Sequence, residues 1–109
     1  MADTSTVDFD SEFDDIVDGL LEHLRGAVPD HTIEIADTEW GCGETWEAIV
    51  YLITCAADYG NPVDSQVIAL SQRLIDLASG LNLGESSQEE LAEVKEALTT
   101  LKQRARVTP

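Results

Sequence analysis

The sequence predicts an all-α protein, a small bundle of four main helices plus one short helix, in a single domain at residues 9–109. Three observations lead to this prediction. Apolar residues recur at three- and four-residue steps along most of the chain, as they do on one face of a helix. Glycine and proline residues separate these segments, as they do at helix ends. A length of 109 residues suits one domain with its own core.

The first helix is predicted over residues 9–28, after a low-complexity segment at residues 1–8 that we expect to be a disordered tail. Asp10 or Ser11 is suited to cap its start, and Pro29 blocks its continuation. One face of this helix carries the apolar residues Phe9, Phe13, Ile16, Val17, Leu20, Leu21, Leu24 and Val28.

The segment "HTIEIADTEW", residues 31–40, fits two patterns. A period of two would make Ile33 and Ile35 part of a short strand. A helical period instead places Ile33, Ala36 and Trp40 on one face. A lone strand would leave its backbone groups unpaired, because no other segment alternates cleanly. We therefore predict a short helix here.

The third helix is predicted to be central, because apolar residues cover most of its circumference. Gly41 or Gly43 is expected to end the preceding helix with a positive φ, and the third helix then starts near Glu44 and stops at Gly60. The narrow remaining strip carries Glu44, Glu47, Tyr51, Thr54 and Asp58.

The fourth helix is predicted between a cap at Asp64 or Ser65 and an end at Gly80. Both features have the residue types that helix ends prefer, so the boundaries are well marked in the sequence. The apolar face of this helix carries Val67, Leu70, Leu74, Leu77 and Ala78.

The fifth helix lies in residues 85–109, and its start matches the capping-box pattern at Ser86 with Glu89 and again at Ser87 with Glu90. Its apolar residues step by three and four: Leu91, Val94, Leu98, Leu101 and Ala105. This face could pack across the other helices or form the seam of a dimer. Because only two heptads are present, we favour intramolecular packing, and a monomer over a homodimer.

The charge of the chain is strongly negative and unevenly distributed. The 22 acidic and 6 basic residues give a net charge of −16, and nearly all of the excess lies in residues 1–64, where Arg25 is the single base. Such a charge argues against nucleic acid or an anionic membrane as a direct partner, because phosphate contacts need lysine and arginine. It favours a basic protein or a divalent cation, although acidity also serves solubility alone.

The sequence predicts no metal, no cofactor and no enzymatic activity. Cys42 and Cys55 form no C-x-x-C pair, and a helix between them would separate them by roughly 15 Å, too far for a disulfide. His23 and His31 have neither ligand spacing to these cysteines nor a neighbouring nucleophile motif. Phosphate-loop and calcium-loop patterns are absent.

The amino-terminal sequence "MADTSTVDFD" has neither a basic region nor an apolar region of the kind found in secretory signal peptides. No apolar run approaches the roughly 18 residues that a membrane span needs. We therefore expect a cytoplasmic protein.

A partner-binding surface is predicted around the two tryptophans of "EWGCGETWEAIVYLI", residues 39–53. Aromatic residues are favoured at interface centres, and acidic rims steer basic partners. We expect Trp46 to be a core wedge and Tyr51 to be exposed, whereas Trp40 fits either role. The predicted partner-binding residues are Glu34, Asp37, Glu39, Trp40, Glu44, Glu47, Tyr51 and Asp58.

Residues 31–83 contain, in this order, "EWG", the helix "WEAIVYLITCAADYG" and the segment "NPVDSQVIALSQRLIDLASGLNL". In this order of motifs the chain resembles the small immunity proteins of bacterial polymorphic toxin systems, in particular the MafI-like group. The chain departs from the family in Gly-Cys-Gly after Trp40 and in a long additional carboxy-terminal helix, which leaves the class of toxin open. The resemblance implies a helical protein that binds a toxin domain and blocks its active site, with no catalytic residues of its own.

The charge and the resemblance together predict an immunity protein that neutralises a cognate toxin through its acidic surface. The expected toxin is a basic, nuclease-type domain, because nucleases bind phosphates. The alternative is an acidic chaperone or adaptor for a secreted effector, which would be a homodimer through the seam at residues 91–105.

Overall fold

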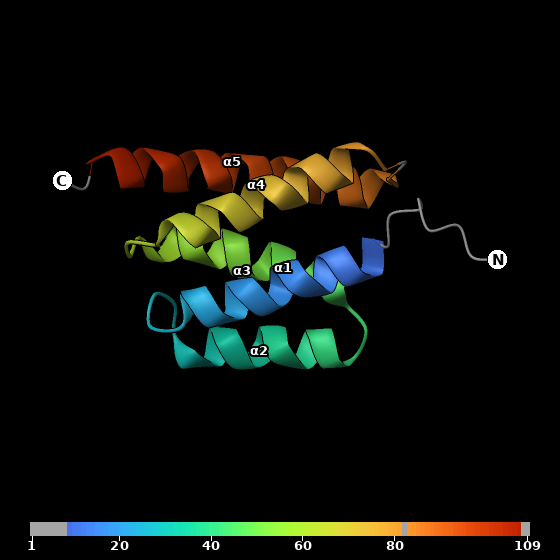
Figure 1. Cartoon of the computed structure of the whole chain (residues 1–109), viewed down its shortest axis with the longest axis horizontal. Coiled ribbons are helices and arrows are strands. Elements are labelled where there is room, and N and C mark those ends of the chain that lie inside the picture. The colour runs from blue at the N-terminus through green and yellow to red at the C-terminus, as the bar shows by residue number, and fades with distance from the viewer. Residues whose placement is uncertain (1–8, 82, 108–109) are drawn as a thin grey trace.

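The computed structural model of the protein describes residues 9–81 and 83–107, and these form five α-helices (Figure 1). The prediction of a small all-α bundle is therefore confirmed, whereas the predicted tail at residues 1–8 lies outside the described residues. The helices are α1 (Phe9–Leu24), α2 (Asp30–Gly41), α3 (Thr45–Tyr59), α4 (Ser65–Ser79) and α5 (Glu85–Val107).

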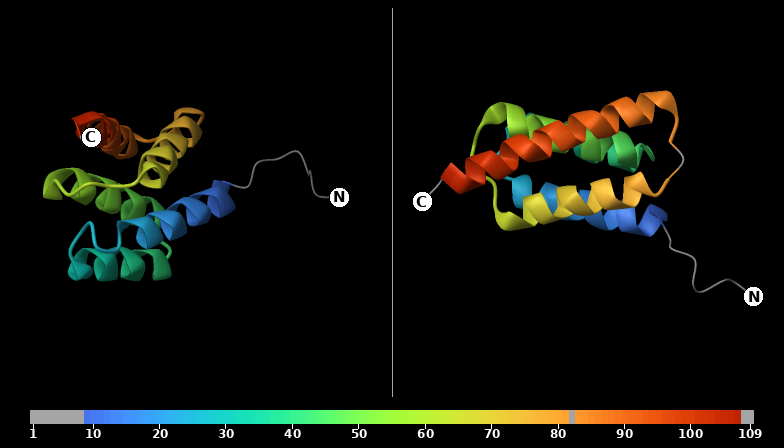
Figure 2. Two further views of the ribbon diagram at one scale, coloured as in Figure 1. Left: turned by 60° about the vertical axis from the view of Figure 1, so that its left-hand side comes forward. Right: turned by 90° about the horizontal axis from the view of Figure 1, so that it is seen from above.

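Four of the helices form a ring in which each packs against the next, in the order α1, α3, α5, α4 and back to α1. Helix α2 is added outside this ring and packs mainly against α3, with further contacts to α1. Consecutive helices run in opposite directions, so α1, α3 and α5 run the same way (Figures 1 and 2). The start of α3 consequently lies at the same end of the molecule as the start of α5.

Helix α3 lies at the centre of this arrangement and contacts α1, α2 and α5, as its apolar circumference predicts. Ile49, Leu52 and Ile53 of α3 are fully buried. They meet large buried side chains from the rest of the ring: Ile16, Leu20 and Leu24 of α1, Leu74 of α4 and Leu101 of α5. Burial of these side chains supplies most of the favourable free energy of folding.

The connection from α1 to α2 differs from the prediction, because α1 ends at Leu24 and not near Val28. Gly26 has a φ of +86°, which a residue with a side chain rarely adopts, and it turns the chain. Val28 nevertheless reaches the core from this turn and is buried. Its apolar character therefore continued the helical pattern beyond the true end of the helix. Pro29 precedes α2 as its N-cap residue.

The segment at residues 31–40 is helical, as predicted, and lies within α2. Ile33 and Ala36 are buried, whereas Ile35 is 44% exposed, which is the division that the helical period predicts. At the start of α1, both predicted caps are wrong, because the helix begins at Phe9, before Asp10 and Ser11.

The cap of α4 is Asp64, one of the two predicted residues, and its Oδ1 accepts hydrogen bonds from the backbone N–H groups of Gln66 and Val67. The buried face of α4 is rotated from the predicted one. Leu70 and Leu77 are only partly buried, whereas Ser71 and Ile75 are buried. The Ser71 hydroxyl donates to the Val67 carbonyl over 2.8 Å, so its burial leaves no unpaired donor. The buried face is completed by Val67, Leu74 and Ala78.

Neither predicted capping box forms in α5, because the helix begins at Glu85 and includes Ser86 and Ser87 in its first turn. The carbonyl of Gly84 instead accepts the N–H of Gln88. The apolar face of α5 packs against α3 and α4, so the prediction of intramolecular packing is confirmed for its described side chains. These buried residues are Leu91, Val94, Leu98 and Leu101, with Ala97 beside them.

Replacing Asp64 by alanine is expected to destabilise the protein by about 1–2 kcal/mol, because it removes the cap of α4 and the carboxylate that accepts a hydrogen bond from His23 Nδ1 at 2.8 Å. The Asp64→Asn variant retains a capping oxygen and should lose less. Urea unfolding at pH 7 measures both differences. Equal losses in the two variants would contradict the capping role.

The bond to His23 and the two backbone bonds lower the pKa of Asp64 below its usual value of 3.8. The stabilisation by this carboxylate is therefore present above pH 3.8 and is lost as the pH falls through the lowered pKa.

Candidate partner-binding face

The turn from α2 to α3 brings acidic side chains close together. The N–H of Glu44 donates to the carbonyl of Glu39 over 2.8 Å, and Gly43 has a φ of +86° that allows the chain to reverse. The predicted positive φ is thus found at Gly43. Glu47 lies in the first turn of α3, directly after this reversal.

Three predicted residues form a group with a fourth carboxylate that the sequence did not indicate. Glu39 and Glu44 lie within electrostatic reach of Glu47, and Glu47 interacts in turn with Glu90 of α5. We call these four residues the acidic corner. Partial burial of its carboxyl group raises the pKa of Glu47, and Glu90 raises it further by charge repulsion and by a hydrogen bond with the Glu47 carboxyl. Burial, followed by repulsion from Glu44, raises the pKa of Glu39. The corner therefore concentrates negative charge at a cost in stability.

The Oε1 atom of Glu39 is buried and has no hydrogen-bond partner. In the described part of the chain, no three histidine, cysteine, aspartate or glutamate side chains are arranged to hold a metal ion. Cys42, exposed in the turn, and Cys55, partly buried in α3, are both free thiols.

Trp46 is partly buried against the core, as the prediction of a core wedge requires. Its ring meets Phe13 edge to face, with 6.2 Å between centroids and 70° between planes. Its Nε1 donates to Glu90 Oε1 over 2.9 Å, which joins the start of α3 to α5. This indole therefore holds Glu90 in the acidic corner.

Trp40, for which the sequence left two roles open, is also partly buried and packs against the core. Its Nε1 donates to Asp14 Oδ1 of α1 over 2.9 Å. One side of the tryptophan lines a pocket of about 420 Å³ together with Phe13, Asp14, Gly43 and Thr45. Trp40 thus contributes to the packing of α2 against α1, and the part of its side chain that a partner could contact is the part that lines this pocket.

The expected exposure of Tyr51 is wrong, because this side chain is partly buried and packs against the core. Burial is the main cause that raises the pKa of Tyr51, and the nearby Cys55 raises it further. A hydrogen bond with Thr32 of α2 opposes that rise. The error has a simple geometric cause. Tyr51 lies at the margin of the polar strip of α3, on the side that α2 covers.

The other two predicted acidic residues of α2, Glu34 and Asp37, are not members of the acidic corner. Glu34 lines a shallow depression of about 320 Å³ with Ile35, Thr38 and Glu39, and Ile35 is one of its exposed residues. Asp37 is exposed on α2 and does not line this depression. The surface predicted from the sequence is therefore divided between the acidic corner and this depression, which share Glu39.

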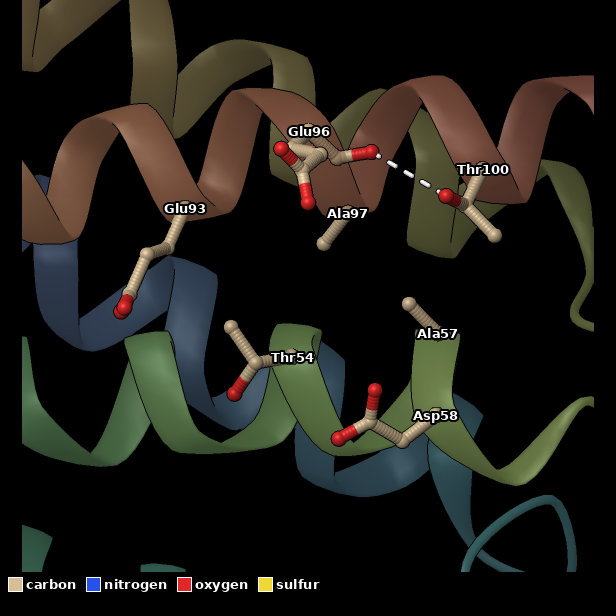
Figure 3. Close-up of a pocket in the computed structure, with 7 residues that line it drawn as sticks. All are labelled: Thr54, Ala57, Asp58, Glu93, Glu96, Ala97 and Thr100. Atoms are coloured by element: carbon tan, nitrogen blue, oxygen red, sulfur yellow. Dashed lines mark hydrogen bonds between the residues drawn. The ribbon is translucent and has the colours of Figure 1, made fainter.

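Asp58, the remaining predicted residue, lines a groove between α3 and α5 (Figure 3). This α3–α5 groove has a volume of about 380 Å³. In Figure 3, Glu93 extends from α5 toward α3, and Ala57 and Ala97 point toward each other across the gap. The lining residues are Thr54, Ala57, Asp58, Glu93, Glu96, Ala97 and Thr100. Sequence analysis missed Glu93 and Glu96, because nothing in their spacing shows which helix α5 would face.

No protein-family model, curated protein or solved structure matches this chain. Among the described residues, none of the helices combines the length and the apolar composition that crossing a membrane requires.

The Glu47→Gln variant is expected to raise the melting temperature by about 1–3 °C at pH 7, because it removes one charge from a crowded group. A carboxyl whose pKa is raised on folding stabilises the protein below its ordinary value of 4.5, and this stabilisation is lost as the pH rises through the raised pKa. The gain in the variant should therefore vanish near pH 4. Thermal unfolding followed by circular dichroism at both pH values measures it.

Glu89→Gln is the matched control, since Glu89 is an exposed residue of α5 outside the acidic corner and carries the same charge. A gain of the same size in the control would assign the effect to net charge rather than to the corner.

Proposed function

We propose that this protein is a cytoplasmic immunity protein that binds a basic, nuclease-type toxin domain and covers its active site. The proposal rests on the net charge of −16, on the resemblance of residues 31–83 to immunity proteins, and on one structural observation. That observation is the set of carboxylates that neighbouring α3 and α5 bring together, Glu47 with Glu90 in the acidic corner and Asp58 with Glu93 and Glu96 in the groove. A cationic cleft built to hold phosphates is the complement of such a surface.

The scaffold beneath these carboxylates is suited to inhibition by binding. The helices that present them, α3 and α5, are packed together and both contribute to the core. A preformed surface loses little conformational freedom on binding, which favours tight association. The excess charge should accelerate encounter with a basic partner at low salt and lose this effect as salt is added.

The adaptor alternative has less support. A homodimer through residues 91–105 would need the apolar face of α5, and Leu91, Val94, Leu98 and Leu101 are buried within the chain. The exposed large apolar residues among the described positions are Ile35 and Tyr59, which lie on different helices. Binding of an unfolded effector would require a broader apolar surface than these residues provide.

A genetic experiment tests the function directly. The open reading frame immediately upstream of the coding sequence is expressed alone in a bacterial host, where we expect it to stop growth, and then together with this chain, where we expect growth to resume. An upstream product without toxicity, or toxicity that this chain fails to relieve, would contradict the proposal.

If that toxin is obtained, reversing the charges of Glu44, Glu47 and Asp58 to lysine should slow its association about tenfold or more at low salt. Stopped-flow fluorescence measures the rate, and thermal unfolding should show little loss of stability because these residues are exposed.

The control for this variant reverses Asp15, Asp18 and Glu22 of α1, which are equally exposed and give the same change in net charge. An equal slowing in the control would mean that steering depends on the charge of the whole molecule. It would contradict the proposal that the toxin docks on the carboxylates of α3 and α5.

A further inference from the structure

The α3–α5 groove lies between two cross-links that fix the separation of its helices. At the amino-terminal ends of both helices, Trp46 Nε1 donates to Glu90 Oε1 over 2.9 Å. At their other ends, the Arg104 guanidinium donates to the carbonyl of Ala57 over 2.8 Å and to that of Ala56 over 3.4 Å. These carbonyls lie in the last turns of α3, where the negative end of the helix dipole also attracts a cation. The groove is therefore a preformed feature of the fold.

The floor of the groove is apolar and is formed by four small residues, two alanines and two threonines. Ala57 and Ala97 point into the gap from opposite helices (Figure 3). The hydroxyl of Thr54 donates to the Val50 carbonyl over 2.8 Å, and its methyl group points toward α5 in Figure 3. The Thr100 hydroxyl likewise donates to its own helix, at the carbonyl of Glu96. Neither hydroxyl has to be met by an occupant of the groove.

The rim of the groove is acidic on both sides. Asp58 stands on the α3 side, and Glu93 and Glu96 stand on the α5 side. None of the three is buried, so each retains a hydrated carboxylate able to accept hydrogen bonds. A side chain that fits must present an aliphatic stem to the floor and a cation to the rim.

Arginine and lysine have this amphipathic form, and the planar guanidinium of arginine can donate to carboxylates from two directions at once. A metal ion fits less well, because no three potential ligands among the described residues are arranged to hold one. A second copy of this chain is disfavoured by its net charge of −16.

We propose that the α3–α5 groove is the subsite that receives an arginine side chain of the partner protein. The inference rests on the proposed function for the existence of a basic partner, but its chemistry depends only on the groove. Arginine insertion would make the groove the specificity-determining part of the acidic face, while the acidic corner contributes mainly to electrostatic steering.

The test uses the peptide acetyl-Ala-Arg-Ala-amide, with citrulline in place of arginine as an uncharged control of similar shape. Two-dimensional ¹⁵N–¹H spectra of the full chain should show saturable shifts at Thr54, Ala57, Ala97 and Thr100 with the arginine peptide. The citrulline peptide should cause none of comparable size. Shifts spread evenly over α1 and α2, or centred on Glu39 and Glu44, would overturn the proposal.

The Glu93→Gln/Glu96→Gln variant should weaken binding of the arginine peptide at least about fivefold. The control Glu85→Gln/Glu89→Gln changes the same charge on exposed positions of the same helix and should change affinity less than about twofold. Equal weakening in both variants would show that binding depends on net charge alone and would overturn the proposed arginine subsite.

This experiment needs no toxin, so the two proposals can fail separately. Arginine binding in the groove without a toxic neighbouring gene would support the subsite and contradict the immunity function. A toxin that this chain neutralises equally well in the Glu93→Gln/Glu96→Gln variant would leave the immunity function and overturn the subsite.

Discussion

The packing of α3 inside the bundle is the constraint on which the other features depend. Because α1, α2 and α5 all contact this helix, only a narrow strip of its surface reaches solvent. Glu47 and Asp58 lie on that strip, and Thr54 lies between them and lines the groove. Acidic groups can therefore gather only where neighbouring helices bring their own carboxylates to the margins of the strip, as α5 does.

The charged groups of this face are arranged with different consequences for stability. Glu90 accepts the indole N–H of Trp46, but it also raises the pKa of Glu47 and so disfavours the ionised form of that residue. Glu39 keeps one buried oxygen without a partner. Local costs of this kind are commonly found where function requires them.

Much of the fold could be predicted because its signals are local. The glycine at position 43, the cap at Asp64 and the apolar circumference of α3 each depend on a few neighbouring residues. The errors in predicted burial have tertiary causes. Val28 reaches the core from a turn, and Tyr51 is covered by α2. Ser71 is buried where α4 packs against its neighbours, and its hydroxyl bonds within its own helix.

The candidate site was predictable only in part for the same reason. Glu39, Glu44 and Glu47 are neighbours in sequence as well as in space, so composition alone could group them. Glu90, Glu93 and Glu96 enter the site because α3 and α5 run in the same direction side by side, and no local pattern encodes that pairing.

The two indole bonds also determine when the tryptophans acquire their native surroundings. Trp40 bonds to a residue 26 positions away and Trp46 to one 44 positions away, so helix formation alone satisfies neither. Both require contacts between distant parts of the chain, and folding steps that depend on such non-local contacts are slower than those that depend on local ones. Intrinsic fluorescence should consequently follow assembly of the bundle, while far-ultraviolet circular dichroism follows its helices, and a lag between the two signals would expose a helical but unpacked intermediate.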